Sequence, residues 1–219
     1  GHTNGTLTVA RKSLTATIAG VTSTYGQTAT TGTVSFTGVV EGDNVGASVV
    51  VEGTGGTVTP GPTLDAGSYT QRVTGLTGAV AANYELTGGP VTATLTVDPK
   101  TLTYQVANGN FTYGTLAVNG AVTLTGVING DAVAGTVTTW RGADAETLAV
   151  RTDAGSLTQK VTALTGADAG NYRIASTGNT DGTLTIARKS LTYSVTAASS
   201  VYGTAAVLGA ATLTGLVDG

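Results

Sequence analysis

The chain has 219 residues, a formal net charge of −3 and no cysteine, and only 11% of its residues are charged. This acidic balance, without a run of Lys or Arg, argues against a nucleic-acid or anionic-membrane surface. No uninterrupted apolar stretch is close in length to the roughly 18 residues that a membrane-spanning helix needs. Abundant glycine and threonine, without helical spacing of apolar residues, instead predict an all-β fold.

The first elements of the chain are strands joined by a tight turn. Residues 1–9 contain GTLTV, a sequence that closes a later segment as GTLTI, and we interpret them as the last strand of a preceding repeat. Alternation of apolar and polar residues at 14–18 predicts the next strand. A turn at Tyr25-Gly26 follows, where glycine supplies a positive φ, and then a strand at 34–36.

The next part of the chain holds further short strands bounded by turn residues. Strands are predicted at 45–51, at 67–76, from Asn83 onward, and at 91–97. About seven strands in fewer than 90 residues match a small antiparallel β-sandwich of immunoglobulin-like type. A β-grasp-like arrangement remains the alternative.

The same pattern then recurs along the chain. Tyr25, Tyr113 and Tyr202 follow one another at steps of 88 and 89 residues, each before a glycine. We therefore divide the chain into repeat 1 (residues 10–97), repeat 2 (98–186) and an incomplete third repeat (187–219). Tandem units of this kind usually provide length, stiffness or many copies of one weak contact.

No flexible linker separates one repeat from the next. The residues that face the core change from even numbers (184, 186) to odd numbers (191, 193, 195) across the second boundary, and the step from Val97 to Leu102 has the same odd length of five. We expect Thr183 to Val195 to run as one nearly continuous strand. The change of face then requires either a bulge at Arg188-Lys189 or a neighbouring repeat whose core faces the other way. This predicts a stiff, elongated rod of small β-domains.

Several motifs recur in a fixed order within each repeat. They are TYG at 24–26, GVVEGD at 38–43, GVINGD at 126–131, DAGSYT at 65–70, GADAGNY at 166–172 and GTLTI at 182–186. In this order the chain resembles the MBG domains of YGX type, with features of YDG repeats. The resemblance implies a tandem segment of a large Gram-negative surface or secreted adhesin, haemagglutinin-like and exported by two-partner secretion. Repeat 1 departs from the family pattern at Ala79–Tyr84.

Acidic and amide side chains in the loops suggest one metal site. Calcium takes six to eight oxygen ligands, and the candidates in repeat 2 are Asp131, Asp153, Asp168 and Asn171. Against calcium, no Asp-x-Asp-x-Asp loop is present, and Asp168 has no counterpart in repeat 1. Pairs of carboxylates such as Asp65 with Asp43 or Asp153 with Asp131 could serve a glycosidase-like reaction, but capping of turns explains them better, because Asp before Ala-Gly favours an Asx-turn. We therefore expect no cofactor, with calcium as the alternative.

One aromatic residue is a candidate for ligand binding. Trp140, the single tryptophan, precedes Arg141, and such a pair stacks on a sugar or anchors a protein partner. Local packing at a sandwich edge is the alternative interpretation. An enzyme is not expected, because the only histidine is His2 and no cysteine is present.

These features together predict a structural role. We expect a stalk segment of an extracellular or cell-surface bacterial adhesin or biofilm-matrix protein, outer-membrane-associated or secreted. Other parts of the parent protein would then bind a surface polysaccharide or receptor. The alternatives are repeats that bind exopolysaccharide themselves and self-association into an extracellular filament.

Overall fold

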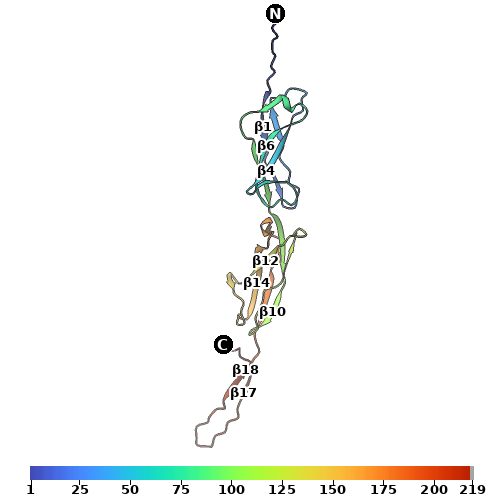
Figure 1. The fold of residues 1–219 in the computed structure, drawn as a ribbon. Coiled ribbons are helices and arrows are strands. Elements are labelled where there is room, and N and C mark those ends of the chain that lie inside the picture. Colours follow the sequence, from blue (N-terminus) through green and yellow to red (C-terminus); the bar gives the residue numbers. More distant parts are fainter. Residues whose placement is uncertain (218–219) are drawn as a thin grey trace. The chain divides into compact units, whose positions relative to one another are not determined.

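The regular structure of the chain consists of short strands and two three-residue 3-10 turns (Figure 1), in a computed structural model that describes residues 1–217. The predicted all-β fold is confirmed. No helix in this described part has the length and apolar character needed to cross a bilayer. The chain forms two compact units. Unit 1 comprises Gly1–Leu102, Gly126–Val133 and Gly166–Arg173, and unit 2 comprises Thr103–Thr125, Ala134–Thr165 and the residues from Ile174 onward.

Repeat 1 contributes eight strands and one 3-10 turn to unit 1. They are β1 (Lys12–Ile18), β2 (Val21–Thr24), β3 (Val34–Thr37), β4 (Gly46–Gly53), β5 (Gly56–Val58), β6 (Gly67–Thr77), η1 (Ala81–Asn83), β7 (Tyr84–Leu86) and β8 (Thr92–Asp98). One sheet has the strand order β3-β1-β7 and the other has the order β2-β8-β6-β4-β5. The two sheets supply the two layers of the core.

These sheets are mixed, so the prediction of a purely antiparallel sandwich is wrong in this respect. β1 pairs parallel with β7, and β2 pairs parallel with β8, while the pairs β1–β3, β4–β5, β4–β6 and β6–β8 are antiparallel. The cause is local. The chain leaves β1 at Ala19-Gly20 and enters the second sheet as β2, so one continuous segment serves both sheets. β1 and β2 therefore pair with strands that run in the same direction as well as with a strand that runs in the opposite direction.

The core of unit 1 is apolar with one buried amide at its centre. Leu14 and Leu95, from opposite sheets, are fully buried. Gln71 is also fully buried, and its Oε1 accepts a hydrogen bond of 2.6 Å from the Gly32 N–H. Its Nε2 donates to the carbonyls of Ala19 and Thr94. Ala19 and Gly32 lie just outside β1 and β3, and Thr94 lies within β8, so the buried amide satisfies backbone groups beside two strand ends and one within a strand.

Repeat 2 and the residues after it follow the same plan. The elements are β9 (Lys100–Val106), β10 (Gly109–Thr112), β11 (Val122–Thr125), β12 (Ala134–Arg141), β13 (Asp144–Glu146), β14 (Gly155–Thr165), η2 (Ala169–Asn171), β15 (Tyr172–Ile174), β16 (Gly182–Ala187), β17 (Thr192–Val195) and β18 (Ala211–Thr214). The strand orders β11-β9-β15 and β10-β16-β14-β12-β13 reproduce those of repeat 1. Gln159 occupies the place of Gln71 and is likewise fully buried.

The change of core-facing residues between repeats occurs at a proline. Leu95 and Val97 are buried in β8, and Leu102 and Tyr104 are buried in β9, which confirms the predicted odd step. Only Pro99 separates the two strands. Proline has no N–H to donate to a sheet, so pairing stops at that residue and resumes on the other face.

The next boundary differs from the prediction. β16 ends at Ala187 and β17 begins at Thr192, so the continuous strand expected from Thr183 to Val195 is wrong. Arg188-Lys189 lie between the strands rather than in a bulge. The physical reason is that β17 pairs only with β18, in a two-stranded sheet that provides no partner to extend β16.

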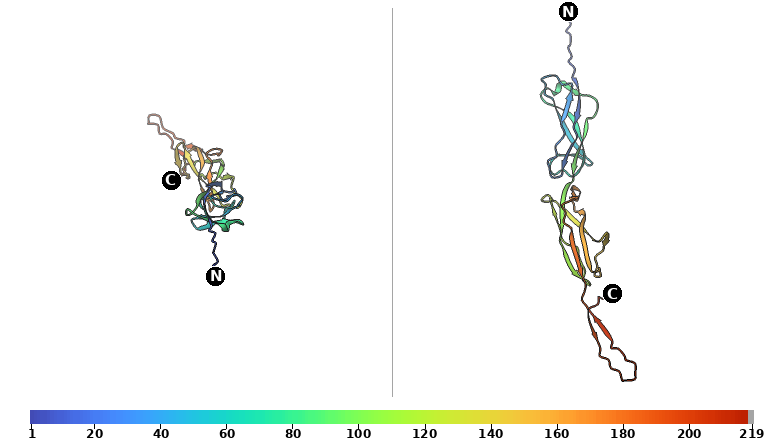
Figure 2. Two further views of the ribbon diagram at one scale, coloured as in Figure 1. Left: turned by 90° about the horizontal axis from the view of Figure 1, so that it is seen from above. Right: turned by 180° about the vertical axis from the view of Figure 1, so that it is seen from behind.

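The two ends of the chain carry apolar residues that no layer covers. In β17, Tyr193 and Val195 are 76% and 58% exposed, and among residues 1–217 no third strand lies beside the β17–β18 hairpin (Figure 2). Residues 218 and 219 of the incomplete third repeat lie outside the described residues. Residues 1–9 are exposed and form no strand. Both segments match sequences that are paired and buried in the complete repeats.

The core of unit 2 should depend on Leu184. Leu184→Ala removes a fully buried side chain from β16, and we expect a loss of about 2–5 kcal/mol in the free energy of unfolding. Urea unfolding followed by the fluorescence of Trp140, in the same sheet, measures it. Leu191→Ala is the matched control, because Leu191 is 45% exposed. Equal losses in the two variants would contradict the assigned core.

Candidate functional site

A cluster of two tyrosines and one carboxylate lies in unit 1, where residues of both repeats meet. Tyr25 follows β2, and its side chain is only 7% exposed. Its ring contacts the ring of Tyr172 edge to face, with centroids 5.4 Å apart and planes inclined by 80°. This is a favourable geometry for two aromatic rings, because the positive edge of one faces the negative face of the other.

Both tyrosines donate hydrogen bonds to Asp131. The Tyr25 hydroxyl lies 3.0 Å from Asp131 Oδ2, and the Tyr172 hydroxyl donates to the same oxygen. The Ile128 N–H in turn donates to the Tyr172 hydroxyl oxygen at 3.0 Å. Burial, followed by the hydrogen bond to the charged carboxylate, raises the pKa of Tyr172 to about 12 and raises that of Tyr25 as well. The cluster therefore favours neutral tyrosines around one anionic acceptor.

A second polar contact lies close to the first in the same unit. Asn171 Nδ2 donates to Asp65 Oδ1 at 2.9 Å, and the Ala66 N–H donates to Asn171 Oδ1 at 2.8 Å. Both ends of the Asn171 amide are thus used, and the residue is only 6% exposed. The Asp-Ala-Gly turn of repeat 1 consequently holds the Asn-Tyr loop of repeat 2.

The glycine of the Tyr-Gly turn completes the cluster. Gly26 has a φ of +84°, and a Cβ built on it would lie 2.4 Å from Ile128 Cδ1. The place of the missing side chain is therefore occupied by an aliphatic side chain of the next repeat. Glycine is required here both for the backbone conformation and for this close approach.

Repeat 1 contains the same loop residues without the contacts from a preceding repeat. The Tyr84 hydroxyl donates to Asp43 and accepts from the Val40 N–H at 3.1 Å, as Tyr172 does with Asp131 and Ile128. Asn83, the counterpart of Asn171, is exposed. The Tyr–Asp bond is thus internal to each repeat, whereas the contacts of Tyr25 and Asp65 are additional.

The four calcium candidates have separate roles. Asp131 and Asn171 take part in the contacts above, and Asp168 Oδ2 accepts from the Ala132 N–H at 2.7 Å. Asp153 belongs to unit 2. Within residues 1–217 no group of three or more His, Cys, Asp or Glu side chains is arranged to hold a metal ion. The bonds of Asp131 and Asp168 join residues that are distant in the sequence, so turn capping and calcium binding both stay predictions.

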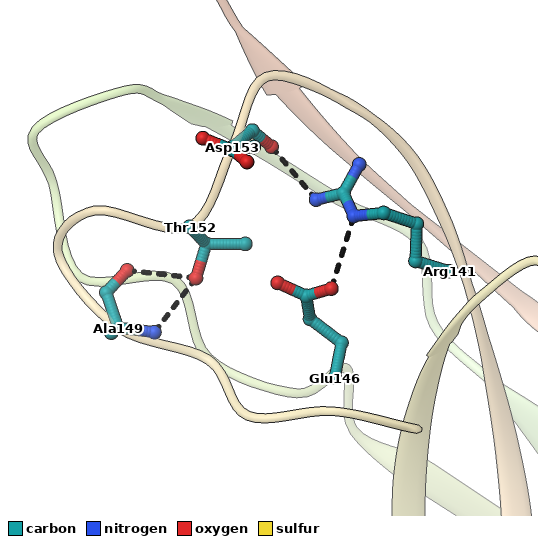
Figure 3. Close-up of polar contacts among 5 residues, drawn as sticks. All are labelled: Arg141, Glu146, Ala149, Thr152 and Asp153. Atoms are coloured by element: carbon teal, nitrogen blue, oxygen red, sulfur yellow. Dashed lines mark hydrogen bonds and ion pairs between the residues drawn. The ribbon is translucent and has the colours of Figure 1, made fainter. Parts of the chain in front are cut away.

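Arg141 closes a loop of unit 2 (Figure 3). Its Nε donates to Glu146 Oε2 at 3.0 Å, and its guanidinium also donates to the Asp153 carbonyl at 3.0 Å. In the same loop the Thr152 hydroxyl accepts from the Ala149 N–H and donates to the Ala149 carbonyl. The Arg141 side chain is therefore committed to internal bonds, which fix the path from β13 to β14.

Trp140 lines a cavity of about 360 Å³ with Gly142, Ala143, Thr158 and Lys160. Its Nε1 is buried and makes no hydrogen bond within residues 1–217. The position corresponds to Glu52 in repeat 1, which forms an ion pair with Arg72. The two residues of the predicted Trp-Arg pair therefore have different surroundings, because Arg141 forms hydrogen bonds within a loop and Trp140 lines the cavity. The ligand-binding expectation for both stays a prediction.

The Tyr25–Asp131 and Asp65–Asn171 contacts were not foreseen from the sequence. The signal that could have found them is the recurrence of four motifs, Tyr-Gly, Gly-Asp, Asp-Ala-Gly and Asn-Tyr, at one common step. Recurrence was interpreted as turn formation within each repeat. The structure shows that two motifs of repeat 1 contact two motifs of repeat 2.

Comparison with protein-family models gives no match to this chain, and a search of curated proteins finds no similar sequence. The family resemblance therefore rests on the motifs alone.

The raised tyrosine pKa values predict a loss of stability in alkaline solution. The neutral hydroxyl is favoured in the folded protein, so its contribution is complete below about pH 10, the ordinary tyrosine pKa. It should be lost as the pH rises from about 10 towards 12, the pKa of Tyr172. Urea midpoints measured by circular dichroism across this range test this. Tyr172→Phe should flatten the pH profile, whereas Tyr202→Phe, at a fully exposed tyrosine, should leave it unchanged. Parallel profiles for all three proteins would refute the assignment.

Proposed function

We propose that this chain is a structural repeat segment of an extracellular bacterial adhesin or biofilm-matrix protein, acting as a stalk of tandem immunoglobulin-like domains. One observation carries the proposal: contacts of the Tyr-Gly turn and Asp65 of repeat 1 hold loops of repeat 2. Domains that merely followed one another on a tether would not need such contacts. The motif resemblance to MBG domains of YGX type supports the same role and a location at or outside the bacterial surface.

The connectivity of the chain also supports a mechanical role. Unit 1 takes its residues from three stretches of the sequence, and the stretches 126–133 and 166–173 are flanked on both sides by residues of unit 2. Several covalent connections therefore join the two units where a simple linker would provide one. Each of these stretches leaves unit 2 and returns to it, so pulling the units apart would also have to break the contacts that hold residues 126–133 and 166–173 in unit 1, as a stalk requires. Binding of a receptor or polysaccharide would belong to other parts of the parent protein.

A scattering experiment tests the proposed stalk. We expect the maximum dimension in solution to grow by a constant increment when residues 98–186 are duplicated in the chain, because each repeat would add the same length. The control is a variant with a Gly/Ser linker inserted at Pro99, which should broaden the distribution of dimensions. A duplicated protein that becomes wider rather than longer would overturn the proposal.

Direct binding of an exopolysaccharide is the second candidate function, and the Trp140 cavity is the observation that favours it. An aromatic face beside Lys160 and Thr158 is suited to stacking on a sugar ring and to hydrogen bonding with its hydroxyls. Trp140→Glu, which introduces the residue type found at the equivalent position Glu52 of repeat 1, should reduce retention on a polysaccharide matrix by more than tenfold. Retention that survives this change would exclude the cavity as the binding site.

A further inference from the structure

We propose that the Tyr-Gly end of each repeat is a docking surface for two loops of the following repeat, and that this surface couples the folding of neighbouring repeats. In repeat 1 the Tyr-Gly end consists of Tyr25, Gly26 and Asp65. The loop pair that it receives comprises residues 126–133 and 166–173. Both parts lie within unit 1. The inference deepens the proposed stalk function, on which its biological meaning rests.

The contacts are complementary in chemistry as well as in shape. Tyr25 donates to a carboxylate of the loop pair, whereas the carboxylate of Asp65 accepts from the amide of Asn171. Between them, Ile128 fills the notch left by Gly26. A donor, an acceptor and a notch in fixed order specify one partner, because a displaced loop would leave a charged or buried polar group unpaired.

The chain contains its own comparisons for this surface. Asn83 of repeat 1 is exposed, although its counterpart Asn171 in repeat 2 is buried. In the incomplete third repeat, Tyr202 is fully exposed, and nothing lies within 4 Å of a Cβ built on Gly203. Tyr25 and Asn171 are therefore buried where a neighbouring repeat contacts them, whereas their counterparts Tyr202 and Asn83 are exposed.

Unit 2 carries a second copy of the surface. Gly114 has a φ of +93°, and a Cβ built on it would lie 2.6 Å from Val217 Cγ2, so an aliphatic residue again fills the notch. Tyr113 and Asp153 correspond to Tyr25 and Asp65. Within residues 1–217, neither the Tyr113 hydroxyl nor the Asp153 carboxylate makes a hydrogen bond. The occupant that this surface fits is the loop pair of a further repeat, with a carboxylate for Tyr113 and an amide for Asp153.

Docking of the loop pair should affect the rest of repeat 2 through the backbone. Residues 126–133 connect β11 to β12, and residues 166–173 connect β14 to β15. Ordering these connections removes conformational freedom from strands that must pair with one another. The Tyr-Gly end of one repeat thereby stabilises the sheets of the next, which is nearest-neighbour coupling of the kind that governs tandem repeats.

A double-mutant cycle on the full chain tests the Tyr25–Asp131 contact. Tyr25→Phe and Asp131→Ala are made separately and together, and hydrogen exchange measures the opening equilibrium of residues 126–133 and 166–173. We expect a coupling on the order of tenfold in that equilibrium, as is typical for a hydrogen bond to a charged group. The matched control replaces Tyr25→Phe by Tyr113→Phe, for which no coupling with Asp131→Ala is expected. A coupling equal to that of the control would overturn the proposal.

An exchange of charges tests the second contact in the same protein. Asn171→Asp places a carboxylate opposite Asp65 and should increase opening of residues 166–173 by more than tenfold, since two acids then face one another. Adding Asp65→Asn restores a donor and acceptor pair and should recover most of the protection. Absence of recovery would show that the two side chains do not recognise each other.

The notch is tested by size compensation. Gly26→Ala should increase opening of residues 126–133, and Ile128→Val should partly reverse it, because valine lacks the Cδ1 atom that a Cβ at residue 26 would meet. Gly203→Ala is the control, since Gly203 has a similar φ of +94° but open space around it. If Ile128→Val gives no reversal, the notch does not receive Ile128. These readouts concern folding alone, so loop docking can hold even where scattering rejects the stalk.

Discussion

The Asp131 carboxylate accepts hydrogen bonds from two tyrosines, one in its own repeat and one in the repeat before it. The bond from Tyr172 fixes the Gly-Asp loop against β15, and this bond has an equivalent in repeat 1 between Tyr84 and Asp43. The bond from Tyr25 uses the remaining accepting capacity of a carboxylate that is already in place. A preformed acceptor loses little entropy when a second donor arrives, so the contact between repeats is strengthened by the contact within one.

The loops and the sheets of this fold carry different tasks. Apolar residues of two sheets, such as Leu14 and Leu95, bury one another and stabilise each repeat. Gln71 and Gln159 satisfy backbone groups beside strand ends, and they recur at the same place in both cores. The polar residues of the loops contribute little to these cores. Their positions instead provide the donors, acceptors and notch that another repeat can contact, which allows a small domain to be joined to a copy of itself.

Prediction from the sequence succeeded for local features. Alternation located most strands, the glycine of the Tyr-Gly turn has its expected positive φ, and the odd step from Val97 to Leu102 is present. Two features could not be derived in this way. The parallel pairs of β1 and β2 depend on a crossing between sheets at Ala19-Gly20, which alternation does not encode. The bond between Tyr25 and Asp131 joins residues 106 positions apart, and each already had a sufficient local explanation as a turn residue.

The bulge expected at Arg188-Lys189, within one continuous strand, shows the same limit of prediction from the sequence. The sequence there resembles that of the first boundary, yet β17 does not continue from β16, because its only partner is β18. Strand formation thus follows the available neighbours more than the propensity of the segment. In a chain of repeats, the adjacent repeats provide both the strands and the loops that a segment can contact. The change from Glu52 to Trp140, in the strand next to the edge strand of its sheet, leaves these pairings intact, whereas a change at Gly26 or Asp65 alters the contacts of the next repeat. Variation between repeats should therefore be tolerated at such strand positions and restricted at the Tyr-Gly end.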